Sequence, residues 1–253
     1  MDWQKAYGAW KHGRLASEHK PGTIRKMRRK NICSCAELID YVNEIGFLPL
    51  LNMGIAGWSA QSAVAEEYQY TVLPDGGWEW PLWEWKGEVV RESGCAYGKL
   101  ILQKAAFVSR ECWPDLCNCR RSTHPRPEAG SVEDTILEVL SQGGSMVSND
   151  LRQACGFTEP KMRGKFDTFL SHLQRGGYIV TEDFVYKHDK YGRKYGWGLS
   201  LFTTPEQFFG REACHPDRPA EESYQRLAKV LRKILPDASD VFLENIIYDK
   251  PLR

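Results

Sequence analysis

The sequence predicts an α+β fold that is mainly helical with small β-hairpins, and residues 131–203 carry most of that prediction. Three segments there end at glycine, two of them begin after a residue that can cap a helix, and two β-rich runs follow. The predicted helices are 132–142, 149–155 after Ser148, and the segment from Thr158 to Arg175, and the predicted strands are 178–186 and 195–203.

The third predicted helix has two different faces. Its apolar residues fall three and four positions apart, and Lys161, Lys165, Thr168, His172 and Arg175 cluster roughly 120° away from them. A helix of this kind buries one side and offers a basic side to a partner. The apolar stripe consists of Phe166, Phe169, Leu170 and Leu173, and the candidate contacts with nucleic acid are Lys161, Arg163, Lys165, His172 and Arg175.

The turn between the two predicted strands, 187–194, is both basic and aromatic. A charged helix face or a polar turn, taken alone, is usually only solvated surface. The order helix, helix, basic helix, basic hairpin is that of a winged helix, whose recognition helix can enter the major groove while the wing reaches the neighbouring backbone. The order therefore favours DNA as a partner, with Lys187, Lys190, Arg193 and Lys194 as further candidate contacts.

Composition bounds the class of protein. The 253 residues are 42% hydrophobic, which is enough for a sizeable core, and 34 Lys and Arg against 33 Asp and Glu give no bulk preference for a polyanion. No run of about 18 apolar residues is present, and the N-terminus lacks the apolar core of a secretory signal. We expect a cytoplasmic protein with no membrane partner.

The eight cysteines do not have the spacing of a metal site. Cys33 and Cys35 are separated by one residue, as are Cys117 and Cys119, whereas structural zinc usually takes pairs separated by two to four residues. The sequence therefore predicts free thiols, no metal and no cofactor.

Changes in composition divide the chain into four parts. The first 30 residues carry nine Lys and Arg against two acids, which fits either a phosphate-contacting arm or a solvated terminus. Ser34 and Glu37 form a capping box for a helix to Glu44, and 120–130 reads as a linker. The predicted parts are a basic arm 1–33, a winged-helix-like and Trp-rich region 34–125, a winged-helix domain 126–210 and a helical tail 211–253.

A short stretch is unusually rich in tryptophan and glutamate. Four tryptophans lie between residues 78 and 85, interleaved with glutamates. One interpretation is a packed aromatic layer. The other is a cleft in which a flipped base stacks on an indole beside a carboxylate. The candidates for that second interpretation are Trp80, Trp83 and Trp85 for stacking, and Glu84 and Glu88 for catalysis.

Three motifs carry a resemblance to a known family. Residues 36–50, the run Trp83-Glu-Trp-Lys-Gly-Glu88 and the run Tyr191-Gly-Arg-Lys-Tyr-Gly-Trp197 resemble AlkZ-related proteins. That group is similar to bacterial winged-helix DNA glycosylases, which unhook interstrand crosslinks and excise alkylated purines. The resemblance implies tandem winged helices, DNA binding and a role in DNA repair.

The resemblance also locates the catalytic motif of those glycosylases. It is Gln, an apolar residue, then Gln or Asp, after a Gly-apolar pair, and the matching place here is Gly46-Phe47-Leu48-Pro49-Leu50. Leu48 and Leu50 have neither the carboxylate nor the amide that positions a water. We therefore expect a DNA-binding relative without glycosylase activity. An active glycosylase using Glu84 or Glu88, and a regulatory or protein-interaction module, remain open.

Overall fold

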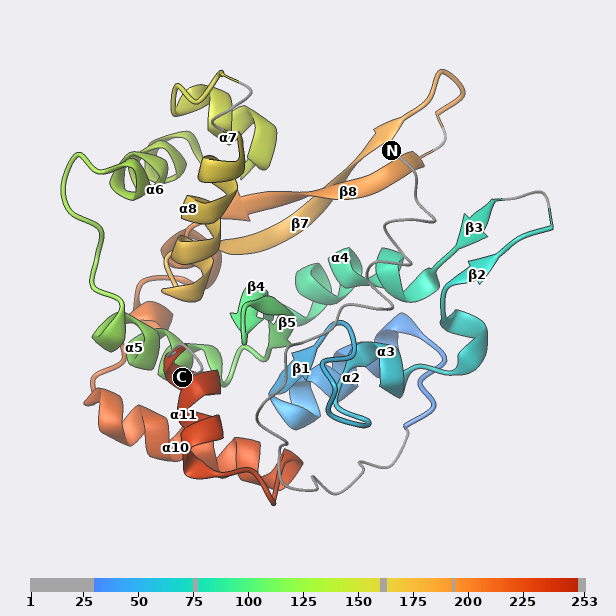
Figure 1. The fold of residues 1–253 in the computed structure, drawn as a ribbon, viewed down its shortest axis with the longest axis horizontal. Coiled ribbons are helices and arrows are strands. Elements are labelled where there is room, and N and C mark those ends of the chain that lie inside the picture. The colour runs from blue at the N-terminus through green and yellow to red at the C-terminus, as the bar shows by residue number, and fades with distance from the viewer. Residues whose placement is uncertain (1–29, 75–76, 160–162, 193, 250–253) are drawn as a thin grey trace.

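The structure is a computed structural model that describes residues 30–74, 77–159, 163–192 and 194–249. Most of the predicted basic arm, residues 1–29, lies outside them. The chain combines helices with small antiparallel sheets (Figure 1). Within the described residues, no helix is both long and apolar enough to cross a membrane.

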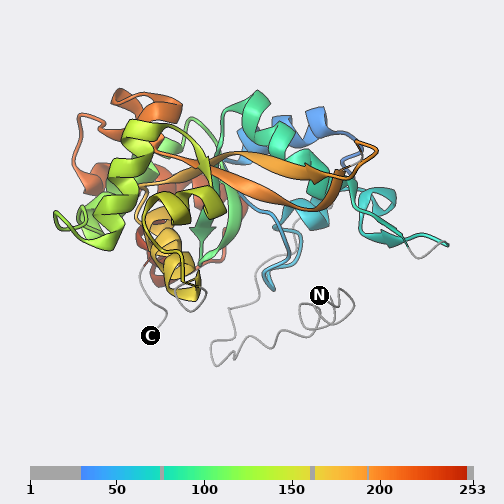
Figure 2. The same cartoon turned by 90° about the horizontal axis from the view of Figure 1, so that it is seen from above.

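The first unit, residues 35–108, contains a three-stranded sheet and three main helices. The sheet has the order β1-β5-β4 and is antiparallel. A two-stranded hairpin, β2 with β3, is inserted before α4 and projects from the body (Figures 1 and 2). The elements are α2 (Cys35–Ile45), β1 (Phe47–Pro49), α3 (Ala60–Ala63), η1 (Glu66–Tyr68), β2 (Thr71–Val72), β3 (Trp78–Glu79), α4 (Pro81–Ser93), β4 (Ala96–Ile101) and β5 (Lys104–Val108).

The second unit, residues 132–203, repeats that order of elements without η1 and the inserted β2–β3 hairpin. Its antiparallel sheet has the order β6-β8-β7. In each three-stranded sheet, the strand that comes last in the sequence, β5 or β8, therefore lies between the other two. The helices and strands predicted for this stretch are present in the predicted order. They are α6 (Val132–Gly143), β6 (Met146–Val147), α7 (Ser148–Ala154), α8 (Arg163–Arg175), β7 (Val180–His188) and β8 (Lys194–Thr203).

The remaining helices join the units and close the first core. They are α5 (Trp113–Thr123), α9 (Pro205–Phe209), η3 (Glu212–Cys214), α10 (Ala220–Ile234) and α11 (Asp240–Tyr248). Leu231 and Ile246 of the predicted tail are buried in the same core as Leu38 and Leu48 of the first unit, whereas Phe166 and Leu170 belong to a second core. The tail therefore packs as part of the first unit's core.

At two predicted helix starts, the hydrogen bonding that caps the helix involves a neighbouring residue instead of the predicted one. Ser34 caps α2 by accepting from the Glu37 amide at 3.2 Å, but the Glu37 carboxylate accepts from the amide of Cys33, not of Ser34. Ser148 is the first residue of α7 and makes no side-chain cap, because Val147 is the N-cap. Both helices nevertheless begin at or directly after the predicted serine, Ser34 for α2 and Ser148 for α7.

The predicted linker 120–130 is wrong in its first residues. Helix α5 continues to Thr123, and Arg120 is 1% exposed. Its guanidinium donates to the carbonyl oxygens of Leu100, Arg175, Ile246 and Ile247, and its Nη1 lies 3.7 Å from Asp249 Oδ1. A charge can be buried at this position because its donors are satisfied by carbonyls of distant segments.

Candidate nucleic-acid interface

Helix α8 presents some of its predicted basic residues to solvent. Lys165 is exposed, and His172 is exposed beside Glu133, with 3.8 Å between Nδ1 and Oε1. Arg175 instead points inward, since its Nε donates to Asp249 Oδ2 at 2.5 Å and only 18% of its side chain is exposed. Arg175 is therefore a structural residue in this conformation. Lys161 and the side chain of Arg163 lie outside the described part of the chain.

The β7–β8 hairpin, which we call the wing, has a basic and exposed end. Lys187, Lys190 and Lys194 are all exposed, and Arg193 lies outside the described residues. Tyr191 at the tip is 70% exposed, with Lys190 Nζ 4.9 Å from its ring centroid. Among the residues that the structure describes, none of these lysines, nor Lys165, forms an ion pair. Their charge is thus available to an external anion.

Strand β7 of the wing packs against helix α4 of the first unit (Figure 1). Gly87 allows the close approach, because a Cβ there would lie 3.1 Å from Asp183 Oδ1 and 3.5 Å from the Phe184 ring. Arg91 Nη1 of α4 pairs with Asp183 Oδ1 of β7 at 2.5 Å. The third helix of the first unit is therefore covered by the hairpin of the second.

Lys86 is the central residue of this contact. It is 1% exposed, and its Nζ lies 3.9 Å from the Trp83 ring centroid and 4.2 Å from that of Phe184. The ammonium donates to the Trp83 carbonyl at 2.9 Å and to Tyr186 Oη at 3.2 Å. Burial lowers the pKa of Lys86 to about 7, although the Glu84 carboxylate acts in the opposite direction.

Two of the three predicted stacking residues form an aromatic cluster beneath the wing. Trp80 and Trp83 stack with ring centroids 5.1 Å apart, and Trp197 of β8 meets Trp83 edge-on at 4.7 Å. Trp80 is only 5% exposed, so it has no face free for a base in this conformation. Trp85 lies apart from them against Tyr68, at 5.1 Å. The structure thus brings together two of the three predicted tryptophans.

The predicted catalytic glutamates lie on the outer side of α4. Glu84 and Glu88 are one turn apart and both exposed. The segment that the resemblance would match to a catalytic motif is buried instead, because Leu48 is 0% and Leu50 is 1% exposed. Leu48 pairs with Phe107 in the sheet, and the Leu50 amide donates to the Ala105 carbonyl. Those leucines belong to the core.

Sequence reasoning missed Lys86 and Trp197. The signal for Lys86 was present, since Trp83, Lys86, Gly87 and Val90 fall on one helical stripe in a segment not expected to be a helix. A lysine and a glycine on the buried side of a helix indicate that something packs closely there. Trp197 had a weaker signal, its two flanking glycines.

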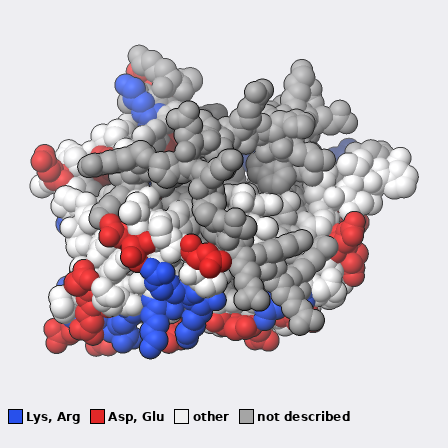
Figure 3. All heavy atoms as spheres, turned by 60° about the horizontal axis from the view of Figure 1, so that its bottom comes forward, with Lys and Arg blue, Asp and Glu red and all other residues white. Residues whose placement is uncertain are grey.

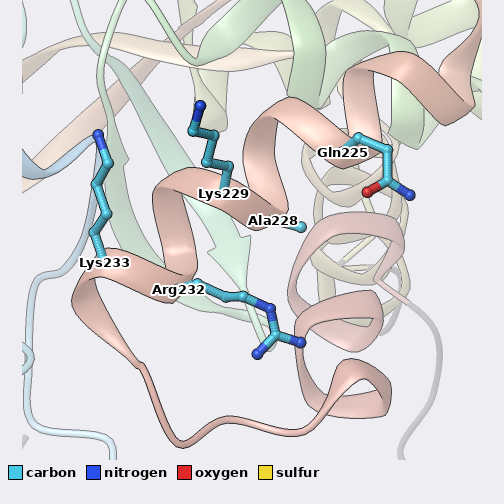
Figure 4. Close-up of a pocket in the computed structure, with 5 residues that line it drawn as sticks. All are labelled: Gln225, Ala228, Lys229, Arg232 and Lys233. Atoms are coloured by element: carbon cyan, nitrogen blue, oxygen red, sulfur yellow. The ribbon is translucent and has the colours of Figure 1, made fainter.

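A second basic surface lies on α10, at the bottom of Figure 1 and away from α8 and the wing. Gln225, Ala228, Lys229, Arg232 and Lys233 line a hollow of about 480 Å³ there (Figure 4). Figure 3 shows that Lys and Arg on this side are bordered by Asp and Glu. Arg226 and Arg232 pair with Asp115 and Asp240, so much of this charge is already balanced.

The cysteines form no metal centre in the described residues. All eight are free thiols, and no group of three or more His, Cys, Asp or Glu side chains there is arranged to hold an ion. Burial raises the pKa of Cys95 and of Cys119 to about 12, as expected for thiols packed into a core.

The arrangement is that of a mixed helix-and-strand protein with small antiparallel sheets and an exposed basic helix and hairpin. The model of the family described as AlkZ related matches residues 32–248, and the chain belongs to that family. No curated protein matches the sequence. Among solved structures, the chain is similar to Streptomyces sahachiroi DNA glycosylase AlkZ, with 13% identity, a TM-score of 0.43 and coverage of 97% of this chain. It spans 64% of the length of that structure.

Proposed function

We propose that this protein binds duplex DNA through the second of two tandem winged helices, in a role related to DNA repair. The observation that carries the proposal is that Lys165 of α8 and Lys187, Lys190 and Lys194 of the wing are exposed and form no ion pair with any residue that the structure describes. A recognition helix and a wing contact the groove and the flanking backbone of one duplex, and lysines there neutralise phosphates.

The order of elements supports the tandem part of the proposal. Apart from η1 and the β2–β3 hairpin inserted in the first unit, each unit runs helix, strand, helix, helix, strand, strand, and the last strand lies between the other two in the sheet. In a winged helix that order places the third helix for the major groove and the last two strands as the wing. Only the second unit has that helix uncovered, because α4 lies under the wing.

The proposal includes the absence of glycosylase chemistry at the place where the family's motif would lie. Leu48 and Leu50 provide no proton acceptor, and both side chains are buried in the sheet. Removing such a group commonly costs a factor of about 10² to 10⁴ in rate. Excision that disappears in Glu84→Gln or Glu88→Gln, while DNA binding survives, would instead establish a relocated active site.

The test is the salt dependence of duplex binding, measured by fluorescence anisotropy. If the surface neutralises roughly five phosphates, log K falls against log salt with a slope of about −4 to −5. The triple variant Lys165→Ala, Lys190→Ala, Lys194→Ala should reduce the slope by about 2 to 3. A matched control removes Lys229 and Lys233 of α10 and should keep the slope. Equal slopes in all three proteins would support a protein-interaction module instead.

A further inference from the structure

Two buried cysteines meet where the second unit joins the rest of the protein. Cys117 lies in α5, ahead of that unit in the sequence, and Cys214 lies in η3, behind it. Cys117 is 0% and Cys214 is 2% exposed, and their thiols are close enough to interact through a hydrogen bond. The Sγ of Cys117 also lies 3.6 Å from the carbonyl oxygen of Cys214. The pair therefore connects the two segments that flank the second unit.

The surroundings favour a thiolate at Cys214. The hydrogen bond from Cys117 lowers the pKa of Cys214, and the guanidinium of Arg121 and the indole N–H of Trp113 act in the same direction. Burial and the Glu206 carboxylate act against them. The pKa of Cys117 is raised instead, first by the same hydrogen bond and then by burial. Because the thiolate is the reactive form of cysteine, Cys214 is the nucleophile of the pair.

Trp113 is an independent sign of the same preference. Its ring is 0% exposed and stacks on Phe209 with centroids 5.2 Å apart, and its buried Nε1 makes no hydrogen bond among the described residues. A buried N–H without an acceptor is rare and costly. A thiolate at Cys214 supplies that acceptor, since hydrogen bonds to a charged group are stronger than those to a neutral one.

A small oxidant can reach Cys214 through a short local opening. The helix η3 is a single turn, and the residue after it, His215, is exposed. Opening one turn of this kind costs far less than unfolding the protein. Cys214 is also alone among the eight cysteines in having a lowered pKa, since the pKa of each of the others is raised. We therefore expect it to react first.

We propose that Cys117 and Cys214 are a redox-active pair that hydrogen peroxide converts into a disulfide. The Cys214 thiolate attacks one peroxide oxygen, so an S–O bond forms while the O–O bond breaks, and the departing hydroxide takes up the proton that this thiol had lost. The Cys117 sulfur then attacks the sulfenic acid. The S–S bond forms, the S–O bond breaks, and the oxygen leaves as water with the proton of Cys117. Both thiols are oxidised, and the peroxide is reduced to water.

The disulfide would enclose the whole second unit. Cys117 and Cys214 lie 97 positions apart in the sequence, on either side of residues 132–203. A covalent link across a long loop stabilises a protein by restricting its unfolded chain. The oxidised protein should therefore unfold at a temperature about 5 to 15 °C higher than the reduced protein. This effect does not depend on DNA binding.

The test treats the reduced full chain with hydrogen peroxide and maps tryptic peptides without reduction. The expected product links Cys117 to Cys214 and is reversed by dithiothreitol. Fragmentation must locate the bond, because Cys112 and Cys119 share the tryptic peptide of Cys117. Cys117→Ser should stop the reaction at a sulfenic acid on Cys214, which dimedone traps. Trp113→Phe keeps the stacked ring without its N–H and should slow disulfide formation roughly three- to tenfold. Cys119→Ser, a buried thiol of the same helix, is the matched control and should keep the rate.

Three results would overturn the inference. Peroxide that modifies the partly exposed Cys33 or Cys155 and leaves Cys117 and Cys214 reduced would place the reactive thiol elsewhere. A bond from Cys214 to another cysteine of α5 would show that the pair is assigned wrongly. Equal slowing by Trp113→Phe and by the control would show a loss of packing instead of a lost donor. The map of the unchanged protein needs no variant, so it decides the question even where a variant fails to fold.

Discussion

The two units share one order of elements, yet their third helices have opposite surroundings. The inner stripe of α4 lies under the wing, while α8 leaves Lys165 and His172 exposed. The hairpins account for the difference. In the first unit the two-residue turn Leu102-Gln103, with φ of +45° and +62°, closes β4 on β5 at once. In the second, strands of 9 and 10 residues reach as far as α4. The length of the hairpin, more than the sequence of the helix, therefore determines which third helix is exposed to solvent.

The largest expected effect comes from separating the two units at Arg120. Arg120→Ala leaves the carbonyls of Leu100, Arg175 and Ile246 without their donor, and it removes the more deeply buried of the two cations beside Asp249, which keeps its pair with Arg175. Loss of one member of a buried charge pair costs about 3 to 5 kcal/mol. Urea unfolding measures it, with Arg126→Ala as the control, because 69% of that side chain is exposed and its effect should stay within about 0.5 kcal/mol. Similar losses in both variants would contradict the assigned role.

The next effect compares a glycine in each third helix. Gly87 of α4 faces Asp183 and Phe184 within 3.5 Å of a built Cβ, whereas a Cβ on Gly164 of α8 meets nothing within 4 Å. Gly87→Leu should therefore push the wing away and destabilise the protein by about 1 to 3 kcal/mol. Gly164→Ala should stabilise it by roughly 0.5 to 1 kcal/mol, because a helical glycine is entropically costly. Thermal unfolding of both variants checks the pair, and two changes of the same sign would refute the contrast.

The second unit was readable from sequence because its signals are local. The apolar spacing of Phe166, Leu170 and Leu173 and the basic turn lie within the stretch they organise, and the structure has the helices and the hairpin there. Helix α2 was predicted for the same reason, from Ser34 and the buried Leu38 and Val42. Local capping and periodicity suffice where an element packs on its own neighbours.

The first unit's third helix was not predicted, because its packing partner is about 100 residues away and the stripe that faces it contains a lysine and a glycine. The inner face of α4 mixes Trp83, Lys86 and Gly87, which suits the wing and matches no simple amphipathic pattern. Arg120 misled for a similar reason. The sequence predicted a linker at Arg120, because the carbonyl oxygens that accept its hydrogen bonds belong to the distant residues 246 and 247. Buried charges of this kind depend on tertiary contacts that sequence spacing does not reveal.

The wing contact should also give the protein a pH dependence. The pKa of Lys86 is lowered to about 7 by burial, below the ordinary value of 10.5. Between those values the unfolded chain binds more protons, so stability rises with pH, by at most about 1.4 kcal/mol per pH unit from this group. Lys86→Met should flatten the slope between pH 7 and 9. That window lies below the titration of Tyr186, whose pKa burial raises. Lys229→Met on the exposed face of α10 is the control, and an unchanged slope in Lys86→Met would contradict the assignment.

The smallest expected effect is at the rim of the same contact. Arg91 and Asp183 join α4 to the wing, but their side chains are 50% and 29% exposed, so water screens the pair. Pairs of this kind usually contribute about 0.2 to 1 kcal/mol. A double-mutant cycle with Arg91→Ala and Asp183→Ala, followed by urea unfolding, isolates the coupling from the loss of packing. If the coupling energy of Arg91 and Asp183 exceeded the contribution of Lys86 to stability, this partly exposed ion pair would be the main attachment of the wing to α4. The buried cation, Gly87 and the aromatic cluster lead us to expect the reverse, because only there are the contacting groups removed from water.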